Sequence, residues 1–205
     1  MKVCVNDKVV GPSPGDGATL DALLDSLRTR GEIGSDEVVV GLQVDRCSWA
    51  PADMDRLQQT QLGGVGEVLI ATEDLRGYAR RILTDAGSML AVLEEATGRV
   101  ADEFRSGPFE KANMDLFNLL HALQRFLACL YHVTNTCGLD QGSGDPQGSG
   151  DPQRQLMAQV AGTLDLVQSS QERQDWASLA AQLEMDLLPA LKGFEGVLHT
   201  MTAEV

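Results

Sequence analysis

The chain has 205 residues, of which 43% are hydrophobic and 22% charged, the composition of a soluble globular protein that can hold one large domain or two small ones. The formal net charge of −14 argues against nucleic acid and anionic membrane surfaces as partners, because their phosphates would be repelled. The amino-terminal residues lack the apolar core of a signal peptide, and no apolar run is long enough to span a bilayer, so we expect a cytoplasmic protein.

Residues 1–72 predict a compact α/β unit. Asn6-Asp7 is a tight-turn dipeptide between two β-branched stretches, which is typical of a hairpin. Val38–Val44 is mostly apolar and β-branched, as expected for a central strand. In order, the pattern predicts strands at 2–5 and 8–10, a helix capped by Thr19 and ending near Gly31, strands at 38–44 and 47–49, a helical turn at 51–57 and a strand at 66–71.

This succession of strands around one helix resembles the β-grasp, or ubiquitin-like, fold. The resemblance lies in the order of the elements and implies a mixed sheet that wraps the helix. The last strand runs into a helix and carries no free Gly-Gly terminus, so conjugation and sulfur-carrier chemistry are excluded. A β-grasp unit in this chain would act in docking or scaffolding.

Residues 73–205 predict helices. An amphipathic helix starts at Thr72 or Glu73 and continues to Phe104, and Gly107-Pro108 separates it from a second helix that is apolar nearly all round. A helix this apolar must be covered on several sides, so we expect it at the centre of a bundle or shared with a partner chain. What remains polar on it is a narrow seam formed by Lys111, Asn118, Arg125 and His132.

Residues 138–153 predict a flexible linker. The hexapeptide GSGDPQ at 142–147 is repeated at 148–153, and neither copy has an apolar residue to bury. A linker of this length allows the chain to cross from one end of a bundle to the other.

Two further helices follow the linker. The third is short and weakly amphipathic, from Leu156 to Val167, and a polar run from Ser169 ends it. Asp175 can cap the fourth, in which Pro189 predicts a kink near Met185. The fold class is therefore α+β, with a β-grasp-like unit at 1–72 followed by an antiparallel four-helix bundle at 73–205.

The break at Arg105–Gly107 followed by Phe109-Glu110-Lys111-Ala112-Asn113 resembles the bacterial flagellar export chaperones of the FliS type. The resemblance covers the order of elements over residues 75–200, and sequence identity over Glu110–Asn113. It implies a helical bundle that holds an unfolded or helical partner in hydrophobic grooves, without catalysis. The α/β unit, the duplicated linker and Pro189 depart from the family pattern.

Candidate chemical sites have simpler explanations. The histidines lack a third ligand nearby, and the paired acids of the first long helix lack the Glu-x-x-His motif of di-iron bundles. The four cysteines contain no CxxC pair and are expected to be reduced. We therefore expect no catalytic residue, metal or cofactor; the side chains considered were His121, His132, His199, Glu94, Glu95, Asp102 and Glu103.

Side chains of the helical part, all but one of them apolar, are the candidate partner-binding residues. They are either bundle core or a groove or dimer face that accepts an amphipathic helix, and the sequence leaves both interpretations open. The function indicated is a non-enzymatic chaperone or adaptor in flagellar or secretion assembly that binds a protein client; the alternative is a homodimeric structural protein with no client. The candidates are Phe109, Asn113, Met114, Phe117, Phe126 and Trp176, with Met185 and Met201 as possible contributors.

Overall fold

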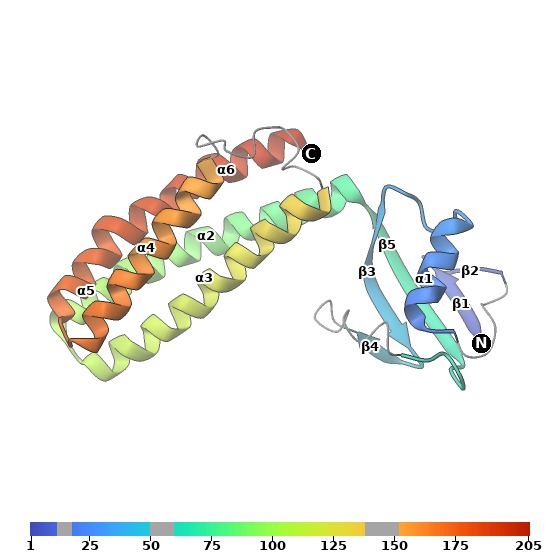
Figure 1. Cartoon of the computed structure of the whole chain (residues 1–205), viewed down its shortest axis with the longest axis horizontal. Helices are drawn as coiled ribbons and strands as arrows, with labels where there is room; N and C mark the ends of the chain where they lie inside the picture. The colour runs from blue at the N-terminus through green and yellow to red at the C-terminus, as the bar shows by residue number, and fades with distance from the viewer. Residues whose placement is uncertain (12–17, 50–59, 138–151) are drawn as a thin grey trace. The chain divides into compact units, whose positions relative to one another are not determined.

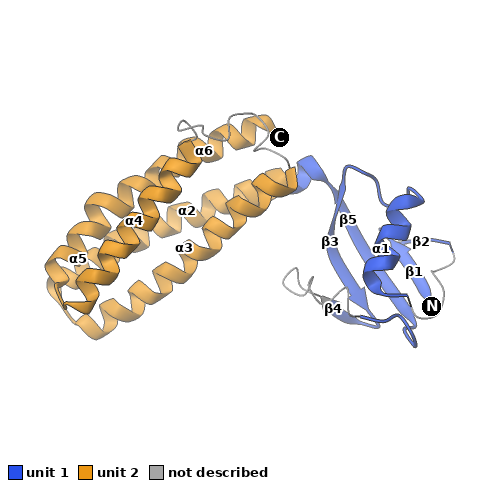
Figure 2. Cartoon of the chain, in the orientation of Figure 1, with its two compact units in different colours: residues 1–78 blue, residues 79–205 orange. Residues whose placement is uncertain are grey.

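The computed structural model describes residues 1–11, 18–49, 60–137 and 152–205, and the protein is of the predicted α+β class (Figure 1). The chain divides into two compact units, a first unit of residues 1–78 and a helical unit of residues 79–205 (Figure 2). The helical turn predicted at 51–57 lies outside the described residues, as does all of the predicted linker except Pro152 and Gln153. Among the described helices, none is both long and apolar enough to cross a membrane.

The first unit is a five-stranded sheet with one helix. The strand order is β2-β1-β5-β3-β4, in which β1 and β5 are parallel and the other pairs are antiparallel. Asn6 and Asp7 have φ angles of 47° and 66°, which gives the predicted tight turn between β1 and β2. The elements are β1 (Lys2–Val5), β2 (Lys8–Val9), α1 (Leu20–Thr29), β3 (Glu37–Val44), β4 (Cys47–Trp49) and β5 (Glu67–Asp74).

Helix α1 lies across one face of this sheet (Figure 1). The Thr19 hydroxyl accepts a hydrogen bond from the Ala22 backbone N–H at 3.3 Å, which caps the first turn as predicted. Gly31 has a φ of 72° just after the last turn, a conformation that glycine adopts without strain. The core between helix and sheet consists of Leu20, Leu23, Leu24 and Leu27 of α1 packed with Val3, Val5, Leu42, Val44, Val68 and Ile70 of the strands.

The first long helix begins later than predicted. Thr72, Glu73 and Asp74 continue β5, because they pair with Val39, Val38 and Glu37 of β3. The Asp74 carboxylate then accepts a hydrogen bond from the Gly77 backbone N–H at 2.7 Å, beside the first turn of the helix. The helices that follow are α2 (Leu75–Ser106), α3 (Phe109–Cys137), α4 (Pro152–Glu172), α5 (Trp176–Gln182) and α6 (Leu188–Glu204).

The described part of the chain after residue 74 thus holds five α-helices, whereas the sequence predicted four. A π-helical turn, η3 (Leu183–Leu187), divides the last predicted helix into α5 and α6, and the Leu188 N–H donates to the Leu183 carbonyl across it. Pro189 has no N–H and its ring would crowd the carbonyl of Met185, so the wider turn occupies the place where the kink was predicted. Pro152 and Gln153, predicted as the end of the linker, lie instead in the first turn of α4, a position that suits proline.

Buried side chains along α2 and α3 alternate in steps of three and four residues. This spacing keeps one stripe of each helix facing its neighbours, as in coiled coils. Ala128, Met114, Phe117 and Tyr131 lie outside the stripe and are exposed, so α3 is enclosed on its inner side and not nearly all round. The stripes are Ala79, Leu83, Ala86, Leu90, Leu93, Thr97, Val100 and Phe104 in α2, and Ala112, Leu116, Leu119, Leu123, Phe126, Leu130 and Val133 in α3.

Two phenylalanines of α3 provide a matched test of this core. Phe126 is fully buried and packs edge to face on Phe194, with ring centroids 5.4 Å apart, whereas Phe117 is 60% exposed. Phe126→Ala should lower the free energy of unfolding by about 3–5 kcal/mol, because it removes an aromatic ring and leaves a cavity. Measured at a protein concentration low enough that copies of the chain do not associate, Phe117→Ala should change it by less than about 0.5 kcal/mol. Urea denaturation followed by circular dichroism measures both, and equal losses would contradict the assigned faces.

Candidate functional site

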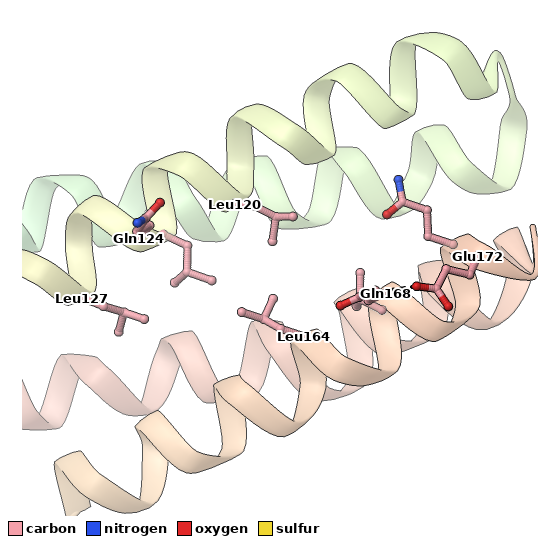
Figure 3. Close-up of a pocket in the computed structure, with 9 residues that line it drawn as sticks. Leu120, Gln124, Leu127, Leu164, Gln168 and Glu172 are labelled. Atoms are coloured by element: carbon pink, nitrogen blue, oxygen red, sulfur yellow. Dashed lines mark hydrogen bonds between the residues drawn. The ribbon is translucent and has the colours of Figure 1, made fainter.

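An apolar groove lies between α3 and α4 of the helical unit, with a volume of about 750 Å³. Leu123 and Val167 are buried at its floor, and Leu120, Leu127 and Leu164 are half-buried at its walls. Figure 3 shows the side chains of the two helices turned toward the space between them. The lining is Leu120, Leu123, Gln124, Leu127, Leu164, Val167, Gln168, Gln171 and Glu172.

The position of α4 explains why this groove is open. Helix α4 runs close to α5, η3 and α6 along its other side. Gly193 of α6 permits this approach, since a Cβ there would lie only 2.6 Å from the Cδ2 atom of Leu156. Because α4 packs against α6, it lies farther from α3 than from α6. The leucine side chains line the space between α3 and α4 but do not fill it.

Side chains tie one end of the groove together. The Gln171 amide donates to the Asn113 side-chain oxygen at 2.9 Å, which links α4 to α3, and the Asn113 amide donates to the Phe109 carbonyl at 2.7 Å. Trp176 stacks on both Phe104 and Phe109, with ring centroids 5.5 and 5.2 Å away. Asn113, Phe109 and Trp176, three of the predicted partner-binding residues, therefore hold the helices together at this end.

The other predicted partner-binding residues separate into two groups. Met114 and Phe117 are 67% and 60% exposed on the outer side of α3, and the Phe117 ring contacts His121 edge to face at 4.4 Å. Phe126 is fully buried against Phe194, so it belongs to the core and does not line an exposed surface. The two methionines divide in the same way, since Met185 is 70% exposed and Met201 is 5% exposed.

Sequence reasoning did not identify the groove. The sequence pattern predicts only that Leu120 and Leu127 lie in a helix that is apolar nearly all round, and that Leu164 lies in the weakly amphipathic helix after the linker. The available signal was that each of them directly follows a buried position, Leu119, Phe126 or Thr163. An apolar residue beside the stripe widens the apolar face on one side of the helix, which is the side of the groove.

Charged pairs flank the tied end. Lys111 bonds Glu103 and also Asp115 at 2.8 Å, so the Asp115 and Glu103 carboxylates raise the pKa of Lys111. Lys111 in turn lowers the pKa of Asp115. Arg105 of α2 pairs with Glu184 of η3, and this hydrogen bond lowers the pKa of Glu184. These ion pairs lie at the surface, with Glu103 and Asp115 partly covered, and add little stability of their own.

The groove is suited to bind apolar side chains. Of the described residues that line it, Glu172 alone is charged, and the three glutamines supply uncharged donors and acceptors at the rim. Within the described ranges, no group of three His, Cys, Asp or Glu side chains is placed to hold a metal ion. The arrangement therefore offers hydrophobic contact and neutral hydrogen bonds to a ligand.

The fold and the groove define a mixed α+β protein whose helical unit carries an open apolar groove. Residues 81–196 match the family described as a domain of unknown function, DUF8042, and the chain belongs to this family. The match extends over both helices that form the groove. No curated protein and no solved structure matches the chain.

The cap of α5 predicts a pH dependence. The Asp175 carboxylate accepts a hydrogen bond from the Ser178 backbone N–H at 3.1 Å, and its hydrogen bonds with Ser178 hold the pKa of Asp175 below its usual value of 3.8. Because the pKa is lower in the folded state, the carboxylate stabilises the fold above the usual pKa, and this contribution is lost as the pH falls through the folded-state value. Asp175→Asn keeps a capping oxygen that does not titrate.

We therefore expect the melting temperature of the wild type to fall more steeply in acid than that of Asp175→Asn. Thermal melts followed by circular dichroism at a series of pH values from neutral into the acid range measure this. A difference between the two proteins that stays constant over the whole range would contradict the assigned cap.

Proposed function

We propose that this protein is a non-enzymatic interaction module that binds an amphipathic helix of a protein client in the groove between α3 and α4. The observation that carries the proposal is the leucine-lined groove of about 750 Å³ between the two helices, which the Asn113–Gln171 hydrogen bond links at one end. In this proposal α5, η3 and α6 act as one rod, so that the helical unit is an antiparallel four-helix bundle.

The lining fits a helix better than an extended peptide. Leu120 and Leu127 are seven residues apart on α3, and Leu164 faces them from α4, so the apolar contacts repeat at the spacing of helical turns. A client helix with apolar residues at i, i+3, i+4 and i+7 would place them on this surface and its polar residues at the glutamine rim. An extended strand would need backbone partners, which two helices with internal hydrogen bonds do not supply.

A role in flagellar or secretion assembly is the particular setting we propose. It is supported by the resemblance of Glu110–Asn113 to the FliS-type chaperones, since Asn113 is the residue that ties α3 to α4 beside the groove. The first unit, with β1 parallel to β5 and α1 over one face, supports a β-grasp-like docking or scaffolding role.

Charge placed on the groove walls tests the proposal. Leu120→Glu and Leu164→Glu each put a carboxylate where an apolar client side chain would lie, and Leu166→Glu is the control, because Leu166 of the same helix is 51% exposed and lies outside the groove lining. The probe is a fluorescent amphipathic peptide of about 18 residues, roughly 27 Å of helix, with a leucine face and no net charge. Fluorescence anisotropy gives the dissociation constants.

The two groove variants should weaken peptide binding by roughly tenfold or more, because a buried charge without a partner is costly, while Leu166→Glu should bind as the wild type does. A peptide with the same composition in scrambled order should bind none of the proteins. Equal binding by wild type and both groove variants would refute the groove as the site. A carboxy-terminal flagellin peptide in the same assay tests the flagellar setting separately.

A homodimeric structural module without a client is the second candidate function. The exposed Met114, Phe117 and Tyr131 side chains on α3 favour it, because large apolar side chains are costly to leave in water.

A further inference from the structure

We propose that a second copy of this chain docks antiparallel on the outer side of α3. The contact surface, called here the outer stripe, lies on the side of the helix away from the buried stripe. It borders the groove along Gln124, the one residue the two surfaces share. The outer stripe consists of Met114, Phe117, His121, Gln124, Ala128 and Tyr131, all of them exposed.

The outer stripe has the spacing of a helix-packing seam. Its members follow one another in steps of three and four residues, the same alternation that buries the inner stripe of α3. Met114, Phe117 and Tyr131 are 67%, 60% and 66% exposed. These three large side chains lie on one face over roughly 26 Å of helix, with His121, Gln124 and Ala128 between Phe117 and Tyr131.

The outer stripe is complementary to itself when two copies run antiparallel. A two-fold axis between Ala122 and Leu123 places Phe117 against Ala128 of the second copy, a large ring against a methyl group, and this contact occurs twice. The same axis places Met114 against Tyr131. His121 and Gln124 meet at the centre, where the Gln124 amide can hydrogen-bond the imidazole.

Charge favours a second copy at this place. Two chains of net charge −14 repel each other, so a contact between copies requires a surface without acidic residues. Residues 116–137 contain no Asp or Glu, although the chain has 30 of them, and Arg125 and His132 border the outer stripe. Carboxylates therefore do not oppose each other along this stretch of the contact.

A charge pair engineered across the axis tests the proposal. Phe117→Glu alone should convert a concentration-dependent dimer to a monomer of 22.0 kDa, because it puts two carboxylates into the apolar contact. Ala128→Lys alone should weaken the dimer in the same way. The double variant should recover the dimer, since each introduced carboxylate then meets the lysine of the other copy. Within one chain the two positions are about 16 Å apart and cannot pair.

Sedimentation velocity over a range of concentrations measures these masses, with circular dichroism as the control for folding. The wild type should approach twice the monomer mass, and added salt should weaken the recovered dimer more than the wild type, because its contact is ionic. A wild type that stays monomeric at every concentration, a Phe117→Glu variant that remains dimeric, or a well-folded double variant that remains monomeric would each overturn the proposal. The groove peptide should still bind the Phe117→Glu variant. Its binding therefore tests the proposed function independently of whether the dimer forms.

Discussion

Apolar side chains at alternating steps of three and four residues hold α2 and α3 to their neighbours and determine where every other surface of the helical unit lies. With Leu119 and Phe126 turned inward, Leu120 and Leu127, one position later, face the groove. Phe117 and Tyr131, one position after the buried Leu116 and Leu130, face solvent. The groove and the outer stripe are therefore both consequences of one core register. A shift of the buried stripe by a single residue would rotate α3 by about 100° and remove both surfaces.

The groove also depends on α4 packing more closely against α5, η3 and α6 than against α3. Gly193 leaves room for the Leu156 side chain against α6, since a Cβ there would lie 2.6 Å from the Leu156 Cδ2 atom. The π-turn before Pro189 lets the rod of α5 and α6 pass the proline without losing its buried face, since Leu183 and Leu187 are both fully buried. The close packing of α4 against α6 on one side therefore leaves the open groove on its other side, facing α3.

Local patterns predicted the helices and the tight turns well. Asn6-Asp7 adopts the left-handed backbone that its residue types favour, and the buried stripe of α3 follows its apolar period. The extension of β5 to Asp74 was missed because it depends on pairing with the distant Glu37. The core role of Phe126 could have been predicted, since it lies seven residues after Leu119 and seven before Val133. The apolar residues beside the stripe of α3 could have been recognised, but the groove itself could not be predicted, because the distance between α3 and α4 depends on how α4 packs against α6.

Helix α3 carries apolar residues on more sides than its own chain covers. The side chains of its inner stripe are buried in the core. Leu120 and Leu127 face the groove, and Met114, Phe117 and Tyr131 face solvent. In an acidic chain, a helix that avoids carboxylates from residue 116 onward and keeps aromatic side chains at its surface is poorly explained by solubility alone. Two apolar surfaces on adjoining sides of one helix are better explained by two different contacts, one with a client helix and one with a second copy. The polar Gln124 at their border would let both be occupied without either contact extending into the other.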